Sequence, residues 1–170
     1  LHGAALTRFA DRTILVPGEE RYSCSDLDAK IAQYARLFKA HGLQRGDGFS
    51  ILASNRLEAI FANMAGQVLG LRYSPLHPKG SEEDHLYILD HAKISALLVD
   101  DRHFGERGRA IEAQAKLKAL FTIEGSFGTP VSDADALPDA PVEIEARAGD
   151  IADLFFTGGA TGRPTGRMAR

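Results

Sequence analysis

What the sequence lacks narrows the classes of protein to which it can belong. It contains a single cysteine, Cys24, in 170 residues, so no internal disulfide can form and a cytoplasmic protein is expected. No apolar run reaches the roughly 18 residues that a membrane-spanning helix needs. The formal net charge is −3 and no basic block occurs, which argues against a nucleic acid or an anionic membrane as partner. The chain opens on Leu1 without a methionine or a secretory signal pattern, so we expect a chain boundary or a longer polypeptide there.

Residue clusters that could carry metal or nucleophilic chemistry are also scarce. The six histidines are scattered; His85 and His91 are six positions apart and neither pairs with a cysteine or acid at metal-ligand spacing, so no metal site is expected. Cys24 has no histidine nearby in the sequence and is expected to be a small buried hydrophobe. A helix start explains the acids at 82–84, and a polar strand exit explains those at 100–101. These patterns identify no catalytic residue.

Strand-like and helix-like segments alternate along most of the chain. Apolar runs bounded by turn residues predict strands over 13–16, 21–24, 49–53, 73–76, 96–99 and 120–123. Apolar residues at helical spacing predict helices that begin at Ser25, at Asn55 and at Ser81, and one over 106–118. Ser25 with Asp28 and Asn55 with Glu58 are placed to cap the first two. The alternation predicts an α/β fold with a largely parallel sheet flanked by helices on both faces.

The regular pattern fails over residues 124–150. Glycines, prolines and acids dominate this stretch, which leaves room for one short helical turn near 133–137. We therefore expect a long irregular connection there. Residues 1–170 as a whole are long enough for a single core.

The segment from Asp153 to Gly166 passes from an apolar, aromatic strand into a loop of glycines and hydroxyls. Glycines let successive backbone N–H groups point at one anion, and ligands of α/β folds lie beyond the carboxyl ends of strands. The segment therefore predicts a phosphate-binding turn, with an ordinary glycine-rich turn or a disordered tail as the alternative. Its spacing does not match a Walker A loop. A reductase fingerprint is disfavoured because the chain stops eight residues after Gly162.

Residues 154–166 resemble the Thr-[Ser/Gly]-Gly-Thr-Thr-Gly-x-Pro-Lys-Gly loop of AMP-forming adenylating enzymes, which are the acyl-CoA synthetases, luciferases and adenylation domains of peptide synthetases. Residues 45–58 are similar to the family's Gly-Asp-x-Val-x-Ile-x-x-x-Asn-x-x-Glu segment, and 75–78 to its Pro-Leu-[Asn/His]-Pro. The resemblance covers roughly residues 7–167 and corresponds to the family's first subdomain. We therefore expect that the chain alone does not complete the adenylation.

The resemblance implies an ATP-dependent ligase that converts a carboxylate to an acyl-adenylate and then transfers the acyl group to a thiol, usually CoA. ATP, Mg²⁺ and CoA are implied as cofactors. The implied partners are a small-molecule carboxylate, with a fatty acid suggested by the Thr-Gly-Gly form of the loop, and the rest of the adenylating enzyme; a homo-oligomer is possible. The phosphate cradle would lie in the loop over 157–166 and consist of Thr157, Gly158, Gly159, Ala160, Thr161, Gly162 and Arg163.

Two positions depart from the family pattern. Thr165 stands where the family has its loop lysine, and Ala160 replaces a threonine. Arg163 or Arg167 could supply the missing charge, although the planar guanidinium does not copy the geometry of lysine. Two alternatives therefore stay open: a catalytically silent or interaction module derived from the family, and an adenylation domain that loads a carrier protein. The acyl substrate and the acceptor thiol are not determined by these residues.

Overall fold

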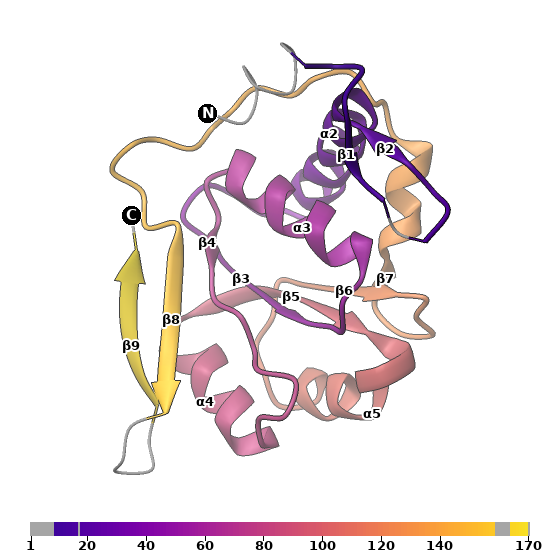
Figure 1. Cartoon of the computed structure of the whole chain (residues 1–170). Coiled ribbons are helices and arrows are strands. Elements are labelled where there is room, and N and C mark those ends of the chain that lie inside the picture. The colour runs from indigo at the N-terminus through magenta and orange to yellow at the C-terminus, as the bar shows by residue number, and fades with distance from the viewer. Residues whose placement is uncertain (1–8, 17, 159–163, 170) are drawn as a thin grey trace.

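A seven-stranded sheet forms the centre of the protein in the computed structural model, which describes residues 9–16, 18–158 and 164–169 (Figure 1). Neighbouring strands are parallel except for the last pair, which is antiparallel. This confirms the predicted α/β fold with a largely parallel sheet. In spatial order the strands are β7 (Thr129–Pro130), β6 (Ala119–Ile123), β5 (Ile94–Asp100), β3 (Gly48–Leu52), β4 (Arg72–Tyr73), β8 (Asp153–Gly158) and β9 (Pro164–Ala169).

Helices cover both faces of this sheet (Figure 1). On one face lie α2 (Cys24–Ala40) and α3 (Leu57–Val68), and on the other lie α4 (Glu82–His91) and α5 (Asp101–Glu112). Alternate strand residues divide between the two cores: Phe49 and Phe121 pack with α2 and α3, whereas Leu97 and Val99 pack with α4 and α5. Burying each such side chain contributes about 1.5–3 kcal/mol.

Helix α2 begins at a different cap from the one predicted. Its N-cap is Ser23, the last residue of β2 (Tyr22–Ser23), and not Ser25. Ser23 accepts from the N–H of Asp26, whose carboxylate accepts from the N–H of Ser23. The backbone of Ser23 is extended, as an N-cap requires, because β2 pairs with β1 (Thr13–Leu15). The corresponding box of Ser81 and Asp84 begins α4 as predicted.

Two further helices differ from their predicted bounds. Helix α3 starts at Leu57 behind Arg56, so the predicted cap by Asn55 is wrong. Helix α5 spans Asp101–Glu112 instead of 106–118, because it follows β5 with no intervening loop. Its glycine at 108 permits close packing, since a Cβ there would lie 2.6 Å from the Phe127 ring. Gly108 lies inside both the predicted and the observed bounds of this helix.

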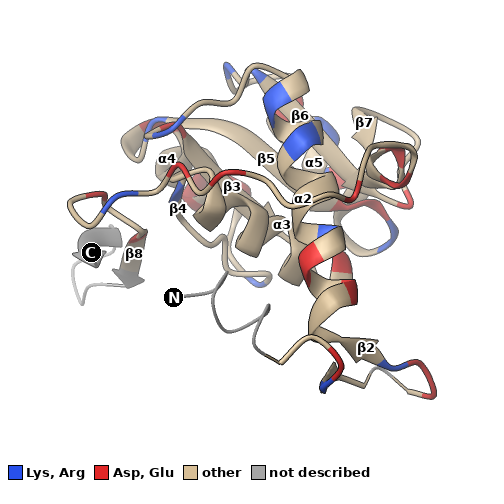
Figure 2. Cartoon of the chain, turned by 90° about the horizontal axis from the view of Figure 1, so that it is seen from above, with Lys and Arg blue, Asp and Glu red and all other residues tan. Residues whose placement is uncertain are grey.

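The chain between β6 and β8 contains β7 and a 3₁₀ helix, η1 (Val131–Ala136), and then runs along α2 to the far side of the sheet (Figure 1). Four polar side chains of α2, spaced three residues apart, bind this connection. The contacts are Lys30 to the Asp135 carboxylate, Gln33 to the Leu137 carbonyl, Arg36 to the Ala140 carbonyl and Lys39 to Glu145. This polar edge of α2 guides the connection toward β8. Basic and acidic residues are interspersed over the described elements (Figure 2).

Candidate functional site

The predicted phosphate-binding segment begins in β8 and ends in β9. Thr157 and Gly158 are the last residues of β8, where their backbones pair with Thr165 and Pro164 of β9. Residues at both ends of the predicted loop over 157–166 therefore belong to strands. The remaining predicted cradle residues lie outside the described part of the chain; they are Gly159, Ala160, Thr161, Gly162 and Arg163.

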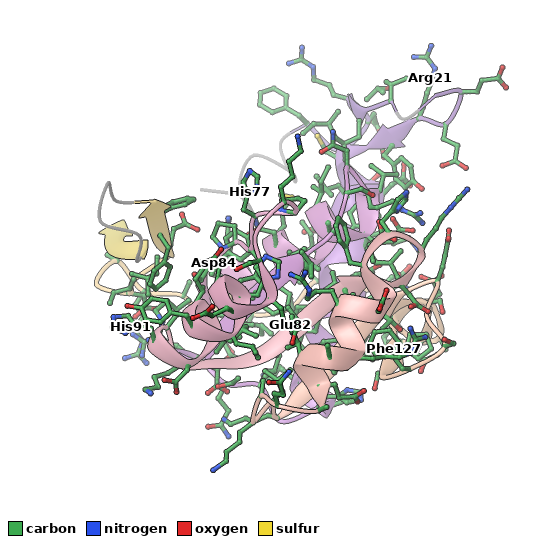
Figure 3. The ribbon with its side chains drawn as sticks, turned by 90° about the horizontal axis from the view of Figure 1, so that it is seen from below. Arg21, His77, Glu82, Asp84, His91 and Phe127 are labelled. Carbon is green, nitrogen blue, oxygen red and sulfur yellow. The ribbon has the colours of Figure 1, made fainter. Side chains whose placement is uncertain are left out.

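One face of β8 packs against α4. Leu154 and Phe156 join the apolar cluster on that side of the sheet. The Phe156 ring meets the His91 ring edge-on at 5.9 Å, and His91 in turn stacks on Tyr87 at 5.3 Å. Figure 3 shows His91 at the end of α4 that lies toward the hairpin. Phe155 alternates with these residues and is 46% exposed. The base of the hairpin is thus supported by α4 on one face and open on the other.

A buried carboxylate lies at the carboxyl end of the neighbouring strands β3 and β5. Asp100, the last residue of β5, is fully buried. Its Oδ2 accepts hydrogen bonds from Ser54 Oγ at 2.6 Å and from His103 Nδ1 at 2.9 Å. Burial acts to raise the pKa of Asp100, but the bonds from Ser54 and His103 outweigh it and hold that pKa below its usual value. The Asp100 carboxylate is therefore ionised at neutral pH.

Asp100 does stand at the exit of a strand, as the sequence interpretation has it, but its burial and the Ser54–Asp100–His103 cluster were missed. Asp100 directly follows the apolar run at 96–99, and that continuity is the signal that it shares the burial of the strand. Because Nδ1 of His103 faces a carboxylate, its proton sits there in the neutral ring and Nε2 is left as an acceptor. His103 is about half exposed, so Nε2 is available to solvent or ligand.

An arginine with two carboxylates occupies the adjoining edge. Arg56 lies 3.2 Å from Glu58 and 2.6 Å from Glu124, which follows β6. Hydrogen bonds to Glu124 and then Glu58 raise the pKa of Arg56, and the same contact lowers the pKa of Glu124. These residues line a cavity of about 500 Å³ between the β1–β2 hairpin, α2 and α3. The arginine is already paired, so it ties α3 to β6 instead of offering a free cation.

Three further cavities, lined by residues that the structure describes, lie near the ends of strands or helices. One of about 440 Å³ is lined by Ser54, Ile60 and Tyr73, and burial raises the pKa of Tyr73 to about 12. Another of about 390 Å³ lies between the starts of α4 and α5, beside His85 and His103. Burial lowers the pKa of His85, whose Nε2 lies 2.8 Å from the His77 carbonyl, which fits a structural role. A larger cavity, about 600 Å³, lies by the amino end of β5, away from the predicted phosphate segment.

Cys24, the first residue of α2, is buried in the core, as the sequence predicted. In the described part of the chain, no group of three or more histidine, cysteine or acidic residues is arranged to hold a metal ion. None of the helices formed by the described residues is long and apolar enough to cross a membrane.

Comparison with known proteins places this geometry in a family. The sequence model of the family described as "AMP-binding enzyme" matches residues 3–170. The chain is 34% identical over 179 aligned residues to the medium/long-chain-fatty-acid–CoA ligase FadD8 of Mycobacterium tuberculosis (strain ATCC 25618 / H37Rv), covering 95% of this chain and 30% of that protein. It is 33% identical over 132 residues to the 2-succinylbenzoate–CoA ligase of Bacillus velezensis, covering 78% of this chain and 25% of that protein.

The fold is also shared with solved structures. The anthranilate CoA ligase AuaEII, in complex with anthranoyl-AMP, superimposes with a TM-score of 0.85 at 18% identity, over 98% of this chain and 33% of that chain. The chain thus spans about a third or less of the length of these proteins. The family match over nearly the whole chain, together with the fold, shows that the chain belongs to the AMP-binding enzyme family and corresponds to the N-terminal part of its adenylate-forming members.

Proposed function

We propose that the protein is an ATP-dependent, AMP-forming acid–thiol ligase of the acyl-CoA synthetase type, and that the β8–β9 hairpin binds the triphosphate. In the first step a carboxylate oxygen attacks the α-phosphorus of ATP, the bond to the β-phosphate oxygen breaks, and pyrophosphate leaves. In the second step the sulfur of CoA attacks the acyl carbon, the thiol proton is released to a base or solvent, and AMP leaves. This chain would contribute phosphate binding to the first step.

The observation that carries the proposal is the position of the glycine- and hydroxyl-rich segment, at the carboxyl end of a strand of a largely parallel sheet. Backbone N–H groups at the glycines would donate to the β- and γ-phosphate oxygens. The hydroxyls of Thr157 and Thr161 and the guanidinium of Arg163 would add donors. Held in this way, the triphosphate presents its α-phosphorus to the carboxylate, which lowers the entropic part of the barrier. The cradle residues remain Thr157, Gly158, Gly159, Ala160, Thr161, Gly162 and Arg163.

Mg²⁺ would offset the triphosphate charge when bound. Among the described residues no ready-made set of three metal ligands exists. Mg²⁺ commonly keeps several waters and takes its other ligands from substrate phosphates and one or two carboxylates. We therefore assign its ligands to phosphate oxygens and water, while the chain itself binds the phosphates.

A fatty acid is the substrate that we propose. Support comes from the Thr-Gly-Gly form of the loop and from the 34% identity to a ligase named for medium- and long-chain fatty acids. The 2-succinylbenzoate–CoA ligase at 33% identity is the competing precedent. The open face of β8 beside Phe155 would receive the remainder of the adenylating enzyme.

The test uses the full-length protein with ATP, Mg²⁺ and a panel of fatty, aromatic and amino acids. Acid-dependent exchange of labelled pyrophosphate into ATP measures the first step, and CoA-dependent release of AMP measures the second. We expect exchange with fatty acids and AMP release only when CoA is added. Exchange with amino acids and no response to CoA would instead indicate a domain that loads a carrier protein. No exchange with any acid would refute the proposed ligase.

Thr165→Lys separates the ligase from a catalytically silent module. In a ligase, a restored lysine adds a charge-assisted contact worth about 1.5–3 kcal/mol to the triphosphate, so the KM for ATP should fall by about tenfold or more. Thr165→Ser is the matched control, which changes the same position without adding charge. A silent module would show no exchange in either variant and no change in nucleotide affinity.

A further inference from the structure

Strand β8 joins the parallel part of the sheet through a very short ladder. Its register with β4 consists of one pair, Tyr73 with Asp153, and the Tyr73 N–H donates to the Ala152 carbonyl at 2.9 Å. In the segment 72–76, the other N–H groups point away from β8, toward β3 and the turn before it. Those bonds run from Arg72 to the Asp47 carbonyl, from Ser74 to the Phe49 carbonyl and from Leu76 to the Ile51 carbonyl.

The next donor toward β8 is missing because the residue there is a proline. In a parallel ladder the N–H groups of every second residue face the same neighbour, so residue 75 follows Tyr73 and its target would be the Leu154 carbonyl. Pro75 has no N–H to give. The Ser74 hydroxyl instead donates to the Leu154 carbonyl at 2.8 Å. A side chain thus replaces the main-chain bond that the proline removes.

The Ser74 side chain that replaces the main-chain bond is buried, and a second hydrogen bond holds its backbone. Ser74 is fully buried, and its own carbonyl accepts a 2.6 Å hydrogen bond from the hydroxyl of Ser50, which is also fully buried. The hydroxyl of Ser50 therefore links β3 to the end of β4, and the hydroxyl of Ser74 links the end of β4 to β8. In the described part of the chain, Ser74 is the one residue whose side chain hydrogen-bonds the main chain of β8. Leu154 stands three residues before Thr157, at the base of the hairpin that carries the predicted cradle.

We propose that Ser74 is a positioning residue for the nucleotide-binding hairpin, and that its hydroxyl fixes the angle at which β8 leaves the sheet. The inference about ATP rests on the proposed function, whereas the inference about the hairpin does not. Beyond Leu154 the strand is paired with β9 and supported by the contact of Phe156 with His91. Without the hydrogen bond from Ser74, the hairpin can change its angle to the sheet by moving about the contact of Phe156 with His91. The groups that we propose as hydrogen-bond donors to the phosphates would then be displaced together with the hairpin.

Ser74→Ala in the full-length protein is the test, and the chain offers two rescues. Ser74→Thr keeps a hydroxyl at the position. Adding Pro75→Ala to Ser74→Ala supplies the main-chain N–H that the ladder lacks. The matched control is Thr122→Val at the far edge of the sheet, which removes an equally buried hydroxyl bond to the Phe127 carbonyl, 3.0 Å long. Amide hydrogen exchange and the KM values for ATP and for the acid are measured for each variant.

In Ser74→Ala we expect amides of β8 and β9 to exchange about tenfold faster, while the rest of the sheet keeps its protection. The KM for ATP should rise by about fivefold to tenfold with the KM for the acid unchanged, and both rescues should restore both values. Unchanged hairpin exchange, an equally large increase of hairpin exchange in Thr122→Val, or failure of both rescues would overturn the proposal. Faster hairpin exchange with an unchanged KM for ATP would overturn the positioning role. If the wild-type protein does not turn over ATP, the proposed function fails. The amide hydrogen exchange data then still test whether Ser74 holds the hairpin in place.

Discussion

Replacing Asp100 with asparagine tests the energetics of the buried cluster at the end of β5. Its carboxylate is fully buried and accepts bonds of 2.6 Å from Ser54 and 2.9 Å from His103. A buried hydrogen bond to a charged group contributes about 1.5–3 kcal/mol, but His103 is 48% exposed, so its bond is discounted to about 0.5 kcal/mol. The amide oxygen of asparagine still accepts one bond. We therefore expect Asp100→Asn to lower the free energy of unfolding by about 1–2 kcal/mol at pH 7.

The loss should depend on pH in a defined direction. Burial raises the pKa of Asp100, but its hydrogen bonds dominate, so the pKa in the folded state lies below the unfolded value of about 3.9. A depressed carboxyl pKa contributes stability above the unfolded pKa, and this contribution is lost as pH falls through the folded pKa. Asparagine does not titrate. The difference between the wild type and Asp100→Asn should therefore shrink below about pH 4.

Urea unfolding followed by circular dichroism at pH 7 and near pH 3 measures this difference. The control is Asp90→Asn, because Asp90 and Lys93 form an ion pair whose side chains are 87% and 76% exposed. That exposed pair should contribute less than about 0.5 kcal/mol at either pH. A loss for Asp100→Asn that is equally large at both pH values, or no larger than that of the control, would refute the reasoning.

Three further substitutions test the packing and capping of the fold. A Cβ at Gly48 would lie 2.6 Å from the Lys93 carbonyl oxygen, so Gly48→Ala should cost about 2–3 kcal/mol and lower the melting temperature, and an unchanged temperature would contradict the close approach. Ser81→Ala removes the box with Asp84 and should cost about 1 kcal/mol, with faster amide exchange confined to the first turn of α4; exchange spread along the helix would argue against a local cap. Phe121→Ala empties a fully buried site and should cost about 3–5 kcal/mol by urea titration, whereas a cost near 1 kcal/mol would mean that the core collapses into the space.

Local patterns predicted the type of most elements. The apolar runs at 49–53, 96–99 and 120–123 became β3, β5 and β6, because strands buried on both faces need apolar residues throughout. Gly42 follows α2 with a φ of +78°, the conformation that a glycine after a helix supplies. Such features depend on few neighbouring residues, so the sequence carries them.

The starts of helices were harder to predict, because several residues satisfied the same local rule. Ser23 and Ser25 each stand three residues before an aspartate, and the pairing of β2 with β1 decided between them. The start of α5 was missed as well, because α5 begins at Asp101 directly after Asp100 of β5 and no turn residue separates the two elements.

The sequence by itself determined the fold class, the buried character of the central strands and the segment at 153–166 that marks the family, because each depends on residue order along the chain. Only the tertiary structure decided that Thr157 and Gly158 belong to a strand, that Asp100 is buried with Ser54 and His103, and that Ser74 replaces the bond lost at Pro75. The hydrogen bonds from Ser54 to Asp100 and from Ser74 to Leu154 join residues that are 46 and 80 positions apart. The physical reason is that hydrogen-bond partners and burial across a sheet follow from strand order, which a linear pattern does not contain.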